Sequence, residues 1–295
     1  MPTVALIASA PELRQAFLDG LRDLGYTDGQ NVRIELRDNP GGFDVAKHAP
    51  VIDELRRSGA AVIVAAGPIP LAAALQRAGD TPVVGIDLES DPVAAGFAKS
   101  LARPGGNITG LFLDLPELGG KQIQLLRESL GRVNRVAIVW DNRIGQPQYR
   151  ATTAAAGAAG LSTTSLPVRQ PADLDHIFPA ATRSGAQGMV ILTAPVIFQN
   201  GARLAAMALR ARMPSISIFT AFAEAGGLIA YGPDFPSIFR QAAGYVERIL
   251  KGARSADLPI ERPAKFELVV NLKTAKAIGV AIPNTILLRT DRVIQ

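Results

Sequence analysis

Four short strand-like segments, each separated from the next by one helical segment, constrain the fold of this chain most. They cover residues 4–8, 31–36, 61–65 and 83–86. The chain between consecutive segments is about long enough for one helix, which suits a crossover between parallel strands. Such crossovers are right-handed almost by rule. The pattern therefore predicts a parallel sheet with helices on both faces.

The expected helices begin and end at residues that favour helix termini. The first follows Ser9, has Pro11 in its first turn and stops at Gly25. A second is expected over residues 49–58, where Pro50 falls in the first turn, because proline disrupts a helix interior. These boundaries support one helix in each crossover.

Residues 83–114 hold two strands, and these strands end in Asp87 and Asp114. In an open α/β sheet, ligands bind outside the carboxyl ends of the strands. We therefore expect this segment to form the floor of a binding cleft and the first strand that crosses between two lobes. Between the two strands, residues 93–101 are expected to form a short helical piece.

The alternation of helices and strands begins again after this segment. Helices are expected over residues 116–130, 146–159, 172–184 and 199–211, and strands over residues 135–140, 161–168, 188–192, 215–218 and 227–231. The similar size and rhythm indicate a second α/β unit. The tail is expected to hold a helix over residues 234–251, a strand over 265–270, a helix over 272–278 and an extended end over 283–294.

Composition excludes several classes of protein. No apolar run approaches the roughly 18 residues that a membrane-spanning helix needs. The absence of cysteine excludes disulfides and thiol chemistry. The net charge of +5 is spread over the chain, with Arg56-Arg57 as the longest basic run, so we expect no nucleic-acid partner. Strand-like residues begin at Val4, so we expect that any export signal has been removed or was never present.

The chain lacks the motifs of common catalytic sites, including G-x-S-x-G, H-E-x-x-H, Walker A and G-x-G-x-x-G. Its two histidines, His48 and His176, are expected to face solvent on surface helices. Paired-carboxylate catalysis by Asp87 and Asp114 stays open as an alternative. The ligand-sensing domain of a regulator is a second alternative.

Three long phrases resemble one protein family. They are GLRDLGYTDGQNVRIELR at residues 20–37, LARPGGNITGL at residues 101–111 and KFELVVNLKTAKAIGVAIPNTILLRTDRVI at residues 265–294. They resemble the substrate-binding proteins of ABC transporters with the type I periplasmic binding protein fold, in the branch that includes tryptophan-binding members. The resemblance covers essentially the whole chain.

This resemblance implies two α/β lobes joined by three crossing segments, with a ligand cleft between them. Lobe one would comprise residues 1–112 plus 231–262, and lobe two residues 113–230 plus 263–295. The crossings would be residues 108–113, 229–232 and 260–266.

The implied function is that of the solute-binding component of an ABC importer, and not that of an enzyme. It would capture a small amphipathic solute by lobe closure, and we expect this solute to be an amino acid with an aromatic or apolar side chain. It would need no cofactor or metal. Its partner would be a membrane-embedded ABC permease, and we expect a periplasmic or cell-surface-anchored monomer.

The candidate ligand-binding residues lie where expected strands end or cross between lobes. They are Ser9, Gly67, Asp87, Asp114, Asp141, Asn142, Pro195, Phe219, Tyr231 and Asp234. Gly67 would let backbone N–H groups approach a carboxylate. Asp87 and Asp114 would accept hydrogen bonds from an ammonium group, and Phe219 and Tyr231 would wall the pocket.

Each of these residues also has a structural interpretation. Gly67 would suit a tight turn between strand and helix. Asp87 and Asp114 would suit helix caps, and Phe219 and Tyr231 would suit the core of lobe two. For Asp234 we favour the cap of the following long helix over a ligand contact.

Overall fold

The computed structural model of this chain describes residues 1–8, 10–38, 44–87, 91–113 and 115–295. It divides into two units, which we call unit 1 and unit 2. Unit 1 is Met1–Asp114 with Asp234–Lys265, and unit 2 is Leu115–Pro233 with Phe266–Gln295. The chain therefore passes from one unit to the other at three places. The prediction of an α/β fold with two mostly parallel sheets is confirmed.

Unit 1 is built on a six-stranded sheet in the order β11-β5-β4-β3-β1-β2, and all of its strand pairs are parallel. The strands are β1 (Thr3–Ile7), β2 (Arg33–Arg37), β3 (Ala60–Ala66), β4 (Val83–Asp87), β5 (Ile108–Phe112) and β11 (Ile260–Glu261). The central strands are almost continuously apolar and buried, as in parallel sheets that are covered on both faces.

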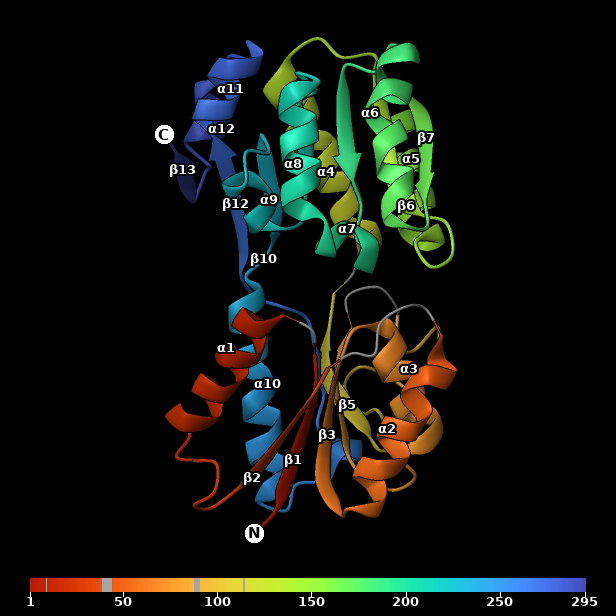
Figure 1. Cartoon of the computed structure of the whole chain (residues 1–295), viewed down its shortest axis with the longest axis vertical. Helices are drawn as coiled ribbons and strands as arrows, with labels where there is room; N and C mark the ends of the chain where they lie inside the picture. The colour runs from red at the N-terminus through yellow and green to blue at the C-terminus, as the bar shows by residue number, and fades with distance from the viewer. Residues whose placement is uncertain (9, 39–43, 88–90, 114) are drawn as a thin grey trace. The chain divides into compact units, whose positions relative to one another are not determined.

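Two helix pairs cover the two faces of this sheet. The helices are α1 (Pro11–Asp23), α2 (Val45–Arg57), α3 (Pro68–Arg77) and α10 (Phe235–Leu250), with a 3₁₀ turn at Ser255–Asp257. In Figure 1, α1 and α10 lie side by side on one face, and α2 and α3 lie on the other. The helix from near the end of the chain thus packs against the first helix.

Unit 2 is built on a seven-stranded sheet in the order β13-β12-β10-β9-β8-β6-β7. The strands are β6 (Arg135–Asp141), β7 (Ser162–Val168), β8 (Gly188–Ile191), β9 (Ser215–Ser217), β10 (Ile229–Pro233), β12 (Phe266–Asn271) and β13 (Arg292–Ile294). Strand β12 runs antiparallel to β10, and the other neighbours are parallel.

Helices cover both faces of the unit 2 sheet. They are α4 (Leu115–Leu130), α5 (Gln146–Ala158), α6 (Leu174–Arg183), α7 (Pro195–Gln199), α8 (Gly201–Arg210), α9 (Thr220–Glu224), α11 (Leu272–Ile278) and α12 (Asn284–Leu287), with a 3₁₀ turn at Pro171–Asp173. Strand β6 shows the two-residue period: Ile138 and Trp140 face the core under α4 and α5, and Val139 faces the core under α6 and α8.

Helix α2 begins earlier than the sequence predicts. The Asp44 carboxylate accepts a hydrogen bond from the Ala46 N–H at 2.9 Å and caps the helix at Val45. Pro50 therefore lies inside the helix, and the prediction that it falls in the first turn is wrong. The N-terminal cap sets the start of the helix. Because proline has no backbone N–H, the helix lacks one internal hydrogen bond at Pro50.

The prediction of a short helical piece over residues 93–101 is also wrong. The described part of this segment contains turns and bends in place of a helix. The Asp91 carboxylate accepts hydrogen bonds from the N–H groups of Val93 and Ala94, which begins a helix-like turn. Gly96 has φ +75°, a left-handed conformation that ends the turn. The apolar spacing of the segment reflects packing of an irregular loop.

Two further expectations differ from the structure. His48 is fully buried in α2, with Nδ1 3.2 Å from the Asp44 carbonyl oxygen, so the prediction that it faces solvent is wrong, whereas His176 is exposed. The extended end predicted over residues 283–294 contains the helix α12 before the strand β13. No helix in the described ranges is both long and apolar enough to cross a membrane.

Candidate functional site

Four of the candidate residues lie at or just beyond the carboxyl ends of neighbouring strands in unit 2. Asp141 ends β6, and Asn142 follows it. Pro195 and Phe219 follow β8 and β9, which are the next two strands of the sheet. We call the ends of β6, β8 and β9, together with the loops that follow them, the carboxyl edge of unit 2. Parallel sheets bind ligands at such edges.

Asp141 is fully buried and bound by an arginine two residues away. Its carboxylate accepts hydrogen bonds from Arg143 at the backbone N–H (2.9 Å), Nε (3.0 Å) and Nη2 (2.6 Å). Arg143 Nη2 also donates to the Arg169 carbonyl oxygen at 2.5 Å. Two-pronged contacts of this kind are strong and geometrically specific. Asp141 therefore fixes the loop after β6 to the loop after β7.

Asn142 adds a second contact between the same two loops. Its side-chain oxygen accepts a hydrogen bond from Arg169 Nε at 2.8 Å. The Asn142 side chain is only half-buried, so the contact lies near the surface of the carboxyl edge. The contact orients the amide group of Asn142.

Two aromatic side chains form a pair at the carboxyl edge. Phe219 is nearly buried at the N-cap position of α9, and its ring meets the Phe198 ring edge-on, with the centroids 4.9 Å apart. Phe198 belongs to α7, which begins at Pro195, and it is 37% exposed. Phe198 was not predicted as a site residue. Its position on the first helical turn after a strand end would have been the signal.

Tyr231 lies in β10, where the antiparallel strand β12 joins the sheet. Its ring stacks against Phe266 with centroids 5.9 Å apart, and its main chain pairs with Leu268. Burial of the phenol, with a smaller contribution from the charge of Asp291, raises the pKa of Tyr231. The hydroxyl therefore stays neutral at physiological pH and can donate a hydrogen bond.

Asp234 caps α10, which confirms the capping role favoured from the sequence. Its carboxylate accepts hydrogen bonds from Ser237 N–H (3.1 Å), Ser237 Oγ (2.8 Å) and Lys265 Nζ (2.9 Å). Burial acts to raise the pKa of Asp234, but the hydrogen bonds from Lys265 and Ser237 outweigh it and hold the pKa below its ordinary value. The carboxylate is thus occupied by its structural partners.

In unit 1, Gly67 lies between β3 and α3 with φ +98°, a conformation that favours glycine. A side chain added there would meet open space, because the nearest atom, Pro70 Cδ, would be 3.9 Å from the added Cβ. The first three residues of α3 are Pro68, Ile69 and Pro70, so only Ile69 has a backbone N–H. The start of α3 therefore offers little to an anion.

The other unit 1 candidates are only partly described. Asp87 is the last residue of β4 and pairs with Phe112 of β5, while its side chain lies outside the described part of the chain. Ser9 and Asp114 also lie outside the described residues. Their roles in ligand binding stay predictions.

Two buried polar residues at the carboxyl edge were not predicted. Gln148 is the third residue of α5 and 3% exposed, and Thr193 follows β8 and is 4% exposed. Gln148 Oε1 accepts a hydrogen bond from the Thr193 N–H at 3.2 Å. Within the described ranges, Gln148 Nε2 and Thr193 Oγ1 are buried without a hydrogen-bond partner. Thr193 lies two residues after β8, and this position just beyond a strand end would have been the signal.

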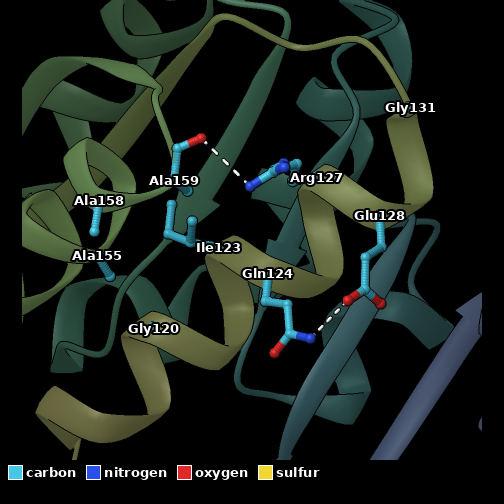
Figure 2. A pocket seen from close by; sticks show the side chains of 9 residues that line it. All are labelled: Gly120, Ile123, Gln124, Arg127, Glu128, Gly131, Ala155, Ala158 and Ala159. Carbon is cyan, nitrogen blue, oxygen red and sulfur yellow. Dashed lines mark hydrogen bonds between the residues drawn. The ribbon is translucent and has the colours of Figure 1, made fainter.

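A pocket of about 680 Å³ lies between α4 and α5, and Figure 2 shows the side chains that line it. It is lined by Gly120, Ile123, Gln124, Arg127, Glu128, Gly131, Ala155, Ala158 and Ala159. Arg127 donates to the Ala159 carbonyl oxygen, and Glu128 accepts hydrogen bonds from Gln124 and Arg289. None of the candidate residues lines this pocket, and its charged side chains are engaged by other groups of unit 2.

Comparison with known proteins links this architecture to one family. The model of the family described as ABC transporter substrate binding protein matches residues 5–294. A tyrosine-binding protein from Clostridioides difficile is 21% identical over 286 residues, which cover 92% of this chain and 77% of that protein.

Two solved structures are similar over nearly their whole length. One is a conserved domain protein from Vibrio cholerae, with a TM-score of 0.89, 24% sequence identity and 99% of each chain covered. The other is an ABC domain from Streptococcus pneumonia in complex with L-Trp, again with a TM-score of 0.89, 24% identity and 99% of each chain covered. At this level of sequence identity, the two similarities support the fold alone.

Proposed function

Because this chain belongs to the family of ABC transporter substrate-binding proteins, we propose that it captures an amino acid with an aromatic or apolar side chain for import. In this proposal it acts outside the cytoplasmic membrane, as a monomer. It delivers its solute to a membrane-embedded ABC permease. The solute is bound and released unchanged, without a cofactor.

The proposal of an amino acid ligand rests on the ligands of two similar proteins. The relative from Clostridioides difficile is a tyrosine-binding protein, and the similar structure from Streptococcus pneumonia holds L-Trp. The carboxyl edge of unit 2 is compatible with such ligands, because it presents the Phe198–Phe219 pair. Aromatic pairs of this geometry provide large apolar contact area for a ring or an aliphatic side chain.

We propose that the solute favours a closed arrangement of the two lobes by making contacts with both of them. The proposed lobes are residues 1–112 plus 231–262 and residues 113–230 plus 263–295. In this proposal Asp87 and Asp114 accept hydrogen bonds from the ligand ammonium group. Tyr231 and Phe219 contact its side chain. Distances between labels on the two units, measured with and without the solute, test closure.

Asp114→Asn tests the ammonium assignment directly. The substitution keeps the size of the side chain and one acceptor but removes the charge. We expect binding to weaken by about 2–3 kcal/mol, the upper part of the range for a hydrogen bond to a charged group, because closure would also shield the carboxylate from water. Equal affinities of wild type and Asp114→Asn, or a solute without a cationic group, would remove this assignment.

Identification of the bound solute tests the proposed function itself. The purified protein is denatured, and the released small molecules are identified by mass spectrometry. Calorimetry with L-tyrosine, L-tryptophan, L-phenylalanine and L-leucine, and with a neutral sugar as the control, then measures affinity. We expect at least one of these amino acids to bind and to be recovered unchanged. Chemical conversion of the bound molecule, or binding of the sugar alone, would overturn the proposal.

A further inference from the structure

Gln148 and Thr193 bring two buried, unpartnered polar atoms to one place in unit 2. They are held together by the hydrogen bond from the Thr193 N–H to Gln148 Oε1. Gln148 Nε2 and Thr193 Oγ1 have no partner within the described ranges. Burial of a polar group without a partner costs free energy, and native proteins keep few such groups. This pair therefore points to a group that binds there.

The chemistry of the pair fits an oxygen acceptor. Gln148 Nε2 can only donate hydrogen bonds, and the Thr193 hydroxyl can also donate one. Gln148 lies in the first turn of α5, a helix of 13 residues, where backbone N–H groups and the helix dipole favour a negative charge. The Gln148 amide, the Thr193 hydroxyl and the start of α5 therefore all favour an anion.

The acid that ends β6, Asp141, does not oppose this assignment. Asp141 precedes α5, and the Gly145 N–H donates to its carbonyl oxygen at 2.8 Å, which ties the start of the helix to the end of β6. The Asp141 carboxylate is held by Arg143 Nε and Nη2. An anion at the start of α5 therefore meets a carboxylate whose charge is already compensated by a guanidinium group.

We propose that Gln148 and Thr193, with the first turn of α5, form the subsite that binds the carboxylate of the amino acid. This inference rests on the proposed function, because it assigns one end of the same solute. It also differs from the expectation that the loop at Gly67 holds the carboxylate. The first three residues of α3 have one backbone N–H, whereas the first three residues of α5 have two, and the side chains of Gln148 and Thr193 lie beside them.

The test compares each amino acid with the amine that lacks its carboxylate. The probes are L-tyrosine with tyramine, and L-tryptophan with tryptamine, measured by calorimetry. The variants are Thr193→Val and Gln148→Met, which keep the approximate side-chain shape and remove the donors. Gln148→Met also removes the acceptor of the Thr193 N–H, so Thr193→Val is the cleaner of the two. We expect each variant to bind the amino acid about 10-fold or more weakly, the scale for loss of a hydrogen bond to a charged group. Affinity for the amine should change little.

Ser215→Ala is the matched control. The Ser215 hydroxyl is also buried without a partner among the described residues, but it begins β9, at the opposite end of that strand from the carboxyl edge. We expect this variant to bind like wild type. Without a solute, Thr193→Val should have an unchanged or raised Tm, because the change removes a buried hydroxyl that no protein group satisfies.

The possible failures can be told apart. In one outcome, the wild-type protein binds tyrosine or tryptophan, and the variants bind it with the same affinity and the same preference for the amino acid over its amine. That result would overturn the subsite and leave the proposed function standing. A lowered Tm of Thr193→Val with unchanged binding would show that the hydroxyl only holds an internal water, and would also overturn it. Wild-type protein that binds none of the four probes would overturn the proposed aromatic ligand and the subsite together. Gln148→Met gives a second measurement if one variant fails to fold.

Discussion

Gly20 of α1 lies directly against the backbone of Arg240 in α10. A Cβ at residue 20 would come within 2.9 Å of Arg240 Cα and 3.0 Å of its carbonyl oxygen. These two helices are far apart in sequence and cover one face of the unit 1 sheet (Figure 1). Glycine thus sets how closely they approach, and no flexible side chain can move aside to make room.

We predict that Gly20→Ala destabilises the protein. The added methyl group would push α1 and α10 apart, and overpacking of this kind costs about 1–3 kcal/mol. Gly244→Ala is the control, because it lies in α10 with no atom within 4 Å of the added Cβ. That change should stabilise the protein by about 0.5–1 kcal/mol through helix propensity. Urea unfolding measures both, and equal effects would show that the close approach carries no cost.

Asp141→Asn should destabilise unit 2 without any need for a ligand. The change weakens the hydrogen bonds of a buried carboxylate to Arg143 and removes the negative charge of the Asp141–Arg143 ion pair. We expect a loss of about 2–4 kcal/mol, below the range for a fully buried pair because Arg143 reaches solvent. Asp175→Asn breaks an exposed ion pair with Arg203 and should cost about 0–1 kcal/mol. Thermal unfolding of the two variants tests the difference.

The Asp234 carboxylate should make stability depend on pH in acid. Its pKa is held below the ordinary value of 3.8 in the folded protein. Its contribution is therefore fully present above the unfolded-state pKa and is lost as pH falls through the lower folded-state pKa. Asp234→Asn keeps a capping group but does not titrate. The stability difference between wild type and this variant should shrink on acidification below 3.8, as measured by urea unfolding across that range. A constant difference would contradict the assignment.

Gly67 and Gly59 provide a matched pair at the two ends of β3. Both have positive φ, and neither would place a Cβ against a close neighbour. Alanine should cost about 1–2 kcal/mol of backbone strain at Gly59 and about 1–3 kcal/mol at Gly67, whose ψ of 162° lies in a region that only glycine adopts readily. Gly67 lies at the carboxyl end of the strand, but its added Cβ would meet open space and the carboxylate is assigned to the start of α5, so neither variant should weaken solute binding. Calorimetry in which Gly67→Ala alone weakens binding about 10-fold would return the carboxylate to the loop at Gly67 and contradict the subsite at α5.

The sequence predicts the architecture well because the strands of parallel sheets are short apolar runs and each crossover holds a helix. The expected strand over residues 135–140 and the observed β6 differ by one residue. The predictions of helix boundaries are wrong where a local contact decides where a helix begins or ends. Asp44 moves the start of α2, and Gly96 stops a turn whose apolar spacing looks helical. Neither effect is visible in hydrophobic periodicity.

The candidate site was only partly accessible from sequence. The rule that ligands bind at strand ends led to Asp141, Asn142 and Phe219, which the structure places at the carboxyl edge of unit 2. It does not show which polar groups are already satisfied. Asp141 is engaged by Arg143, whereas Gln148 has an unpartnered amide nitrogen within the described ranges. Hydrogen-bond satisfaction depends on tertiary contacts, so it needs coordinates.

The pairing of β11 with β5 has a consequence for synthesis on the ribosome. Ile260 pairs with Gly110, and Glu261 pairs with Leu111, so the sheet of unit 1 is completed by residues near the end of the chain. Until they emerge, the nascent chain carries an unpaired edge at β5, and α1 lacks its partner α10. Unpaired edges promote aggregation. Unit 1 therefore cannot mature before unit 2 has been largely translated, so the nascent chain should stay a substrate for holding chaperones until late in its synthesis.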